Sequence, residues 1–487
     1  MTFTLARDEI EGLWEKLDAR VAAGDRFAGL FAAIRPWPPG GPGRTPTMVL
    51  SAQLAVDGGI ETLDVALPPG AGSYPALTPH IGAAFWYERV IHDQFGVIPD
   101  GHPRLAPLVR AGSPDDHALP RHVEGYGVFT FPHGPVRSGV TESIEYLIET
   151  PGEAIPHLNM RVFYKHRGIE QRFGGMPTSE GVLLAERAEG IASVAHALAY
   201  CHAIERIAGC EPPAPALLVR VLHAELERIA NHLDVAAKLA DAGGLGVAAA
   251  RFALYKEKVL RLVSGLCGSR FGRGVVVPGG VRAMPRLSAT ALLAELGQLR
   301  KAISADADSL MATSSFLDRL RTTGPLPPAR ARQHGALGPI GKASGYYDDT
   351  RTERPYDAYP ALDIQPLPTI VEGDAMARLR VRWDEVDQSF NLLGQVAAEL
   401  AGFPDPAGPV VTSCAPGEGR AAGWAEAPQG EVLYDVTVAG GQVSRCHPRS
   451  ASFHNLVLMH DVFADDILTD FPFIEASFGL SFAGVAQ

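Results

Sequence analysis

The chain has 487 residues, 46% of them apolar, which is enough for at least two domains with hydrophobic cores of their own. Its formal net charge of -12 disfavours nucleic acid as a partner, and no long basic run indicates a patch that binds a membrane surface. No stretch of about 18 apolar residues is free of charge, and the opening "MTFTLARDEIEGLWEKLDAR" is amphipathic rather than a secretory signal. We therefore expect a globular protein of the cytoplasm that binds no nucleic acid.

The N-terminal part predicts a small α+β domain. An opening helix precedes a Pro/Gly-rich loop over residues 35–46. Two β-rich runs follow, "TMVLSAQLAV" and "ETLDVAL", and the Asp57-Gly58-Gly59 sequence between them favours a hairpin. Residues 78–96 then show helical spacing of apolar side chains up to Gly96.

The C-terminal part begins with strand-like pieces near residue 125 and is then dominated by helices. The first runs from an N-cap at Thr178 to Gly209, so residues 185–205 are expected to be one continuous helix. The next has the apolar period of a long amphipathic helix and ends at Gly243-Gly244. Further helices are predicted over residues 247–270, 287–322, 376–401 and 453–469. This pattern predicts a large helical bundle flanked by short strands.

The five cysteines are scattered, and no two have the C-x-x-C spacing of zinc ribbons or of many iron–sulfur sites. They are Cys201, Cys210, Cys267, Cys414 and Cys446. We expect reduced thiols that pack as small core residues. His196, His202, His223 and His232 also lack the spacing of an HExxH metal face, and we expect them to be structural.

The string "WYERVIHDQFGVIPDGHPRLAPLV" (residues 86–109) resembles the small peripheral-arm subunit of respiratory complex I. Further strings resemble the large subunit of energy-converting nickel–iron hydrogenases, which is homologous to the quinone-site subunit of complex I. They include "HGPVRSG", "HRGIE", "AYCHAIERIAG", "RVLHAELERIANHL", "VPGGV", "GPIGKASG" and "SASFHN". The fused order resembles the large subunit of formate-hydrogenlyase-type complexes.

The resemblance implies an α+β chain made of two domains. A small α/β domain over residues 1–112 and a linker over residues 113–124 would precede a large, mainly helical domain over residues 125–487. The first would resemble the small peripheral-arm subunit, and the second the hydrogenase large subunit.

Hydrogenases of this family hold nickel and iron through two C-x-x-C pairs, because soft thiolates bind these metals. Alignment on "AYCHAIE" and "DFPFIEASF" places the first pair at Glu189 and Ala192 and the second at Ser481 and Gly484. None of the four is a cysteine. The resemblance therefore implies that the metal centre is lost and that this chain binds no metal or cofactor of its own.

In hydrogenases of this family the metal ligands line one chamber. The resemblance implies that Arg137, Glu189 and Ser481 approach this chamber, which here lacks those ligands. Glu189 is then either a proton-handling carboxyl group in a partly desolvated cavity or one half of a salt bridge with Arg137 that fills the hole. A quinone is a further possibility. Complex I holds the quinone head with a His and a Tyr, whose positions here are Arg137 and Gly190, so Arg137 and Lys342 remain as candidate donors.

The segment "YKHRGIEQRF" carries His166 and Glu170. By resemblance it lies between the chamber and the nearest iron–sulfur cluster of a partner subunit. We treat both residues as candidates for a proton path.

The predicted function is that of an electron-transfer or coupling subunit in a membrane-bound complex related to complex I and to energy-converting hydrogenases. Its partners would be a small iron–sulfur subunit and membrane proton-pump-like subunits, with the chain peripheral to the cytoplasmic face. Two alternatives remain open: a quinone-binding subunit of the NAD(P)H–quinone oxidoreductase type, and a non-catalytic module that couples conformational change to ion movement.

Overall fold

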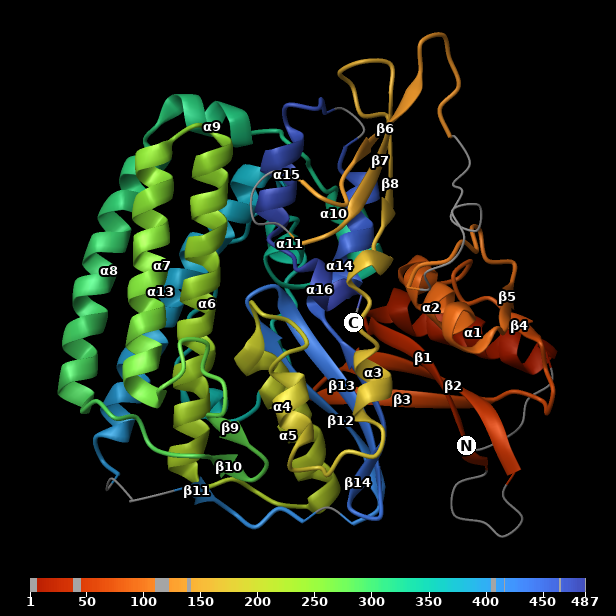
Figure 1. Cartoon of the computed structure of the whole chain (residues 1–487), viewed down its shortest axis with the longest axis horizontal. Helices are drawn as coiled ribbons and strands as arrows, with labels where there is room; N and C mark the ends of the chain where they lie inside the picture. Colours follow the sequence, from red (N-terminus) through yellow and green to blue (C-terminus); the bar gives the residue numbers. More distant parts are fainter. Residues whose placement is uncertain are drawn as a thin grey trace.

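The computed structural model describes residues 7–37, 45–109, 122–137, 142–403, 409–415, 417–463 and 466–486. It contains both helices and strands, in an arrangement that Figure 1 shows from one side. The helical bundle lies on one side of the view and the N-terminal sheet on the other. A second sheet and the C-terminal helices lie between them.

The N-terminal part is a three-stranded antiparallel sheet covered by two helices (Figure 1). Its elements are α1 (Arg7–Ala23), β1 (Arg26–Trp37), β2 (Thr45–Val56), β3 (Gly59–Ala66), β4 (Ser73–Pro75), η1 (Gly82–Ala84), α2 (Phe85–Phe95) and β5 (Ile98–Asp100). Their core includes Trp14, Leu50 and Tyr87. The predicted hairpin is confirmed: Val56 pairs with Gly59, and Gly58 between them has a φ of 73°.

The loop predicted over residues 35–46 is wrong at both ends. β1 continues to Trp37, and β2 begins at Thr45, because the two strands pair along their length despite the prolines. Residues 38–44 lie outside the described part. So do residues 110–121, which contain most of the predicted linker.

A second antiparallel sheet and a series of short helices lead into the large domain. They are β6 (Phe129–His133), β7 (Glu145–Thr150), β8 (His157–Arg161), η2 (Phe163–Lys165), α3 (Ile169–Phe173) and α4 (Gly181–Ala185). The next helix, α5, covers Ser193–Ala208 and ends at Gly209 as predicted. The continuous helix predicted over residues 185–205 is wrong, because residues 186–192 form turns between α4 and α5.

Four long helices form the bundle. They are α6 (Ala214–Ala242), α7 (Gly246–Cys267), α8 (Ala289–Met311) and α13 (Ala375–Leu400). In the bundle, the structure confirms the predicted α6, α7 and α13 to within a few residues, whereas the helix expected over residues 287–322 divides into α8 and α9 (Ser314–Leu320). Between the long helices lie β9 (Val276–Val277), β10 (Gly280–Val281), α10 (Pro328–His334), α11 (Gly338–Ala343), α12 (Thr350–Glu353) and η3 (Tyr359–Ala361).

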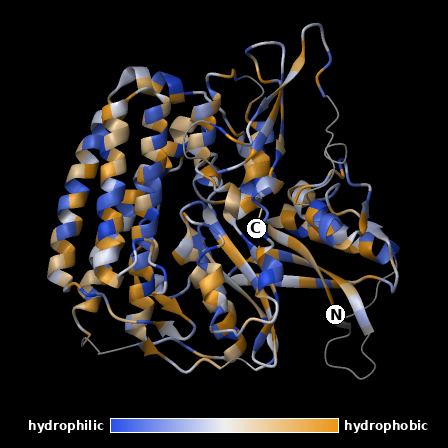
Figure 2. Ribbon diagram, in the orientation of Figure 1, coloured by the Kyte–Doolittle hydropathy of each residue, from blue (hydrophilic) through white to orange (hydrophobic). Residues whose placement is uncertain are grey.

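Figure 2 shows hydrophilic and hydrophobic residues alternating along the bundle helices, as one buried face requires. Within the described ranges, no helix has the length and apolarity that a membrane crossing needs.

The C-terminal part adds one strand, β11 (Val410–Val411), to the antiparallel β9–β10 pair, then forms a further antiparallel sheet and returns to the centre of the molecule (Figure 1). Its other elements are β12 (Gly419–Ala427), β13 (Gly430–Ala439), β14 (Gln442–Arg449), α14 (Ala451–Leu456), η4 (Val457–Asp461), α15 (Phe471–Phe478) and α16 (Phe482–Val485). The single helix predicted over residues 453–469 is therefore wrong. α5 packs against β12, so the sheet holds this helix beside the last residues of the chain.

Candidate functional site

Glu189 lies in the turn before α5, and its side chain is 1% exposed. A second carboxylate explains why the helix does not extend back to it. Glu227 of α6 accepts the backbone N–H groups of Val194 (2.8 Å) and Ala195 (3.1 Å), which fixes the first turn of α5 at Ser193. Glu189 is thus held just outside the helix, facing inward.

Glu189 belongs to a continuous chain of buried hydrogen bonds. His196 of α5 contacts Glu189 Oε2 through Nε2 at 3.2 Å, and its Nδ1 contacts the Tyr434 hydroxyl at 2.8 Å. Ser452 of α14 donates its hydroxyl to Glu189 Oε1 at 2.7 Å. We call these four residues the Glu189 cluster. All four side chains are buried, so the cluster lies away from bulk water.

The C-terminal segment closes against the Glu189 cluster. A Cβ added to Gly484 would lie 2.5 Å from Glu189 Oε2, so this glycine leaves just enough room for the carboxylate. The backbone N–H of Ser481 donates to the Ser452 hydroxyl at 3.1 Å, and its own hydroxyl donates to Glu142 at 2.9 Å. Three of the four positions aligned with metal ligands therefore meet in one place. The fourth, Ala192, is fully buried.

These residues do not fit a nickel–iron centre. Such a centre needs soft thiolate ligands, whereas the four positions offer a carboxylate, a methyl group, a hydroxyl and a hydrogen. The Glu189 carboxylate, hydrogen-bonded on both oxygens, also fills the space beside Gly484.

Arg137 does not pair with Glu189, and this part of the predicted site needs correction. Its guanidinium donates to Glu475 at 2.8 Å and lies 5.3 Å from the ring centre of Tyr146 and 6.0 Å from that of Phe482. Phe482 and Gly484 both belong to α16, so Arg137 and Glu189 contact the same short helix. Arg137, however, forms its ion pair with Glu475 and not with Glu189.

A different arginine, Arg167, contacts the backbone beside Glu189. It donates to the carbonyl oxygens of Ala188 (2.5 Å) and Ala483 (2.8 Å), the residues that precede Glu189 and Gly484. Burial lowers the pKa of Arg167, and the charges of Glu142 and Glu189 partly oppose that change. Arg167 therefore links the turn that carries Glu189 to the C-terminal segment that carries Gly484.

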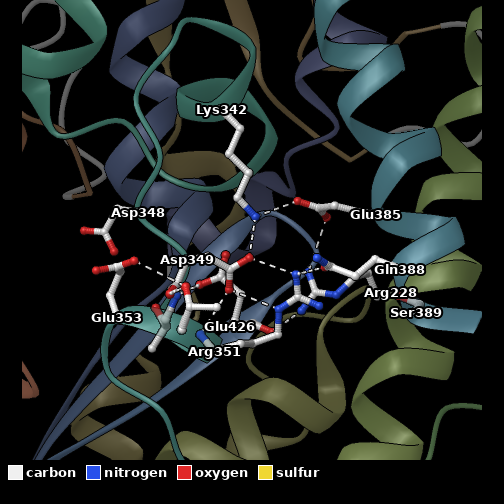
Figure 3. A network of polar contacts seen from close by, with 12 residues as sticks. Arg228, Lys342, Asp348, Asp349, Arg351, Glu353, Glu385, Gln388, Ser389 and Glu426 are labelled. Atoms are coloured by element: carbon white, nitrogen blue, oxygen red, sulfur yellow. Dashed lines mark hydrogen bonds and ion pairs between the residues drawn. The ribbon is translucent and has the colours of Figure 1, made fainter. Parts of the chain in front are cut away.

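Lys342 is the centre of a separate buried network, which Figure 3 shows. Its Nζ donates to Asp349 at 2.6 Å and to Glu385 at 2.8 Å, and its side chain is 1% exposed. Burial opposes its charge, but the two carboxylates outweigh burial and raise the pKa of Lys342. Its ammonium group is therefore engaged by protein carboxylates.

The Lys342 network reaches the C-terminal segment. Glu385 also accepts from His232 Nε2 at 2.7 Å, and His232 Nδ1 lies 3.1 Å from Arg382. Arg382 in turn donates to the Phe478 carbonyl oxygen at 2.9 Å, at the end of α15. His232 thus belongs to a polar path between the bundle and the last residues.

His166 and Glu170 share one cavity, between the N-terminal sheet and α3. His166 Nδ1 lies 2.8 Å from the Ala486 carbonyl oxygen. Burial disfavours the charge of Glu170, but His447 and Arg445, both in contact with it, lower its pKa to about 2. Glu170 is therefore a fixed anion at neutral pH, which suits an ion pair better than a proton carrier.

The sequence assigned no site role to His196, Ser452 or Glu227. His196 was expected to be structural, yet it touches Glu189 directly. Burial raises the pKa of Glu227 to about 8, partly offset by its two backbone N–H donors, and the charge of Glu189 raises it further. The string "RVLHAELERIANHL" holds two glutamates, Glu225 and Glu227, and no local signal distinguishes the second.

Two sequence families match the chain in the order of its two parts. Residues 47–124 match the 30 kDa subunit of respiratory-chain NADH dehydrogenase, and residues 241–415 match its 49 kDa subunit. The chain joins a 30 kDa-type domain to a 49 kDa-type domain. The predicted order is confirmed, whereas the limits 1–112, 113–124 and 125–487 stay predictions.

Individual relatives agree with this assignment. Formate hydrogenlyase subunit 5 of Escherichia coli is 27% identical over 453 residues, which cover 85% of this chain and 77% of that protein. The carbon monoxide-induced hydrogenase of Rhodospirillum rubrum is 28% identical, over 71% of this chain and 96% of its own length. The predicted resemblance to hydrogenase-type and complex I-type subunits is thus confirmed.

A solved structure shares the fold. A chain of the membrane-bound sulfane sulfur reductase, an archaeal respiratory membrane complex, superposes with a TM-score of 0.69 at 24% identity. The match covers 74% of this chain and 99% of that one.

Proposed function

We propose that this chain is an electron-transfer or coupling subunit of a membrane-bound complex of the hydrogenase and complex I type, without a nickel–iron centre. The names of its relatives support the first part, since they are subunits of formate hydrogenlyase, membrane-bound hydrogenase and NADH–quinone oxidoreductase. The contact between Glu189 and Gly484 supports the absence of a nickel–iron centre, because the carboxylate fills the place that thiolate ligands would need.

The proposal includes the partners and the location. A small iron–sulfur subunit would deliver electrons, because the described residues of this chain offer no set of thiolate ligands. Membrane subunits of the proton-pump type would anchor the complex, with this chain peripheral on the cytoplasmic face. The fold shared with an archaeal respiratory membrane complex supports this arrangement.

In this proposal the Glu189 cluster fills the space that the metal centre would take. Its hydrogen bonds satisfy every member, which is what a buried carboxylate requires. The path from Lys342 through Glu385 and His232 to α15 would transmit movement of the C-terminal segment to the bundle, so coupling without chemistry remains the second candidate.

The quinone alternative has less support from the geometry. Arg137 and Lys342, the two predicted donors, belong to different clusters. Each already forms an ion pair with a carboxylate of the protein. A quinone analogue should therefore not bind in a way that depends on both residues. Loss of analogue binding in Arg137→Met and in Lys342→Met, with both variants folded, would instead favour this alternative.

Purification from the native host tests the proposal. The chain would be tagged in its own gene, extracted from membranes in mild detergent and purified, and its companions identified by mass spectrometry, with the untagged strain as the control. We expect an iron–sulfur subunit and polytopic membrane subunits in amounts comparable with the chain. Recovery of the chain alone, from the soluble fraction, contradicts the proposal.

A further inference from the structure

A second cluster of ligand-type side chains lies between residue 122 and the β7–β8 hairpin, and it shares no residue with the Glu189 cluster. Glu149 is in β7, His157 begins β8, and His122 is the first described residue after the segment 110–121. One ligand atom from each lies within 4.8 Å of the other two. The two imidazole rings are 4.0 Å apart, centre to centre, with an angle of 29° between their planes.

The Glu149 carboxylate is held in a fixed orientation. Its Oε2 accepts the backbone N–H groups of His122 (2.8 Å) and Val123 (2.7 Å). Its Oε1 is left facing His122 Nδ1 at 3.4 Å. This separation is long for a hydrogen bond. It equals the distance of about 3.4 Å between two ligands of a tetrahedral zinc ion with bonds of about 2.0–2.1 Å.

The third ligand has an unused nitrogen. His157 Nε2 is buried, and no hydrogen-bond partner for it exists among the described residues. A buried polar atom without a partner costs free energy, and a bound cation would remove that cost.

We propose that His122, Glu149 and His157 bind one divalent transition metal ion of the zinc class. Two imidazole nitrogens and one carboxylate oxygen are ligands that zinc accepts, and water would take the fourth position. The backbone N–H groups on Glu149 Oε2 act as the outer contacts that orient a metal-binding carboxylate. The ion fastens residue 122, in the predicted linker, to the β7–β8 hairpin.

Metal titration of the full-length chain tests this proposal. The purified protein is stripped with a chelator, dialysed, and titrated with zinc chloride by calorimetry and with cobalt chloride by absorption spectroscopy. The variants are His122→Ala, His157→Ala and Glu149→Gln, of which the last keeps an oxygen for the two backbone donors. His80→Ala, which removes a half-buried histidine of the small domain, is the matched control.

We expect one zinc ion per chain, a cobalt spectrum with the intense visible bands of a four-coordinate site, and a higher melting temperature with metal bound. Each of the three variants should weaken binding by about ten-fold or more, while His80→Ala binds as the unchanged chain does. Absence of stoichiometric binding overturns the proposal. So does binding that all three variants retain at full strength.

Discussion

At the scale of single residues, Gly484 and Glu189 define how the chamber is filled. Replacing Gly484 by Ala would press a methyl group against Glu189 Oε2 and the Ser450 hydroxyl, 2.5 and 3.1 Å away. We expect a loss of about 1–3 kcal/mol in the free energy of unfolding, measured by urea denaturation, because overpacking forces neighbouring groups to move. Gly190→Ala is the control, since a Cβ there meets no atom within 4 Å.

A double-mutant cycle assigns this loss to the carboxylate. In a Glu189→Ala background the same Gly484→Ala change should cost clearly less, because the atom that it strikes has gone. An equal cost in both backgrounds would show that Glu189 does not fill the space.

Glu227 makes the stability of the chain depend on pH. Its pKa is about 8 in the folded chain and near 4.5 when unperturbed. Between these values the unfolded chain releases the proton and the folded chain keeps it. The stabilisation is therefore complete below about pH 4.5 and is lost as the pH rises toward 8, by up to about 1.4 kcal/mol per pH unit.

The Glu227→Gln variant should lack this dependence, so its stability relative to the unchanged chain should rise from pH 5 to pH 8. Urea denaturation at pH 5, 6.5 and 8 measures the difference. A difference that stays constant over this interval would mean that Glu227 is ionised in the folded chain.

At the scale of elements, the contact of α5 with β12 positions His196. A Cβ on Gly423 of β12 would overlap the Ala199 carbonyl oxygen and the Ala203 backbone nitrogen of α5. Gly423→Ala should therefore push the helix off the sheet and destabilise the chain by about 3 kcal/mol. Gly394→Ala, in α13 with open space around it, should instead stabilise by about 0.5–1 kcal/mol.

Thermal and urea unfolding of the two variants compare these opposite effects directly. If Gly423→Ala unfolds like the unchanged chain, α5 does not approach the sheet as closely as described.

Elements with strong local signals were predictable. The apolar period of α6, the hairpin at Gly58 and the glycine ends at Gly96 and Gly209 all follow from local sequence, because each depends on neighbouring residues. The break before α5 was not predictable, since its cause is Glu227, 33 residues after Val194.

The pairing of charges in the site could not be predicted from the sequence either. Arg137 pairs with Glu475, 338 residues away, and nothing in the sequence near Arg137 distinguishes that carboxylate from Glu189. The convergence of Glu189 and Gly484 could be anticipated only through the family resemblance, which aligns both with metal ligands.

At the scale of the whole molecule, buried ion pairs join the two domains. Arg26 of β1 contacts Asp348 at 2.5 Å and Glu431 at 2.8 Å, and its side chain is 2% exposed. Arg26→Met would leave two buried carboxylates with one cation fewer. We expect a loss of about 3–5 kcal/mol in the free energy of unfolding at pH 7.

Arg20→Met is the matched control, because Arg20 also bridges two carboxylates but is 39% exposed, so its loss should cost less than about 1 kcal/mol. Despite burial, Arg26 and its neighbouring arginines lower the pKa of Glu431. The stability from this group is therefore present above about pH 4.5 and is lost as the pH falls below it. Equal costs for the two substitutions at pH 7 would contradict a buried ionic junction.

The central claim is that the chamber holds the Glu189 cluster in place of nickel and iron. The direct measurement is the nickel content of the complex purified from its own host, together with hydrogen-dependent dye reduction by the same sample. With a carboxylate, a methyl group, a hydroxyl and a hydrogen at the four aligned positions, we predict nickel far below one atom per chain and no reduction of the dye. Stoichiometric nickel with hydrogen-dependent dye reduction would contradict the account.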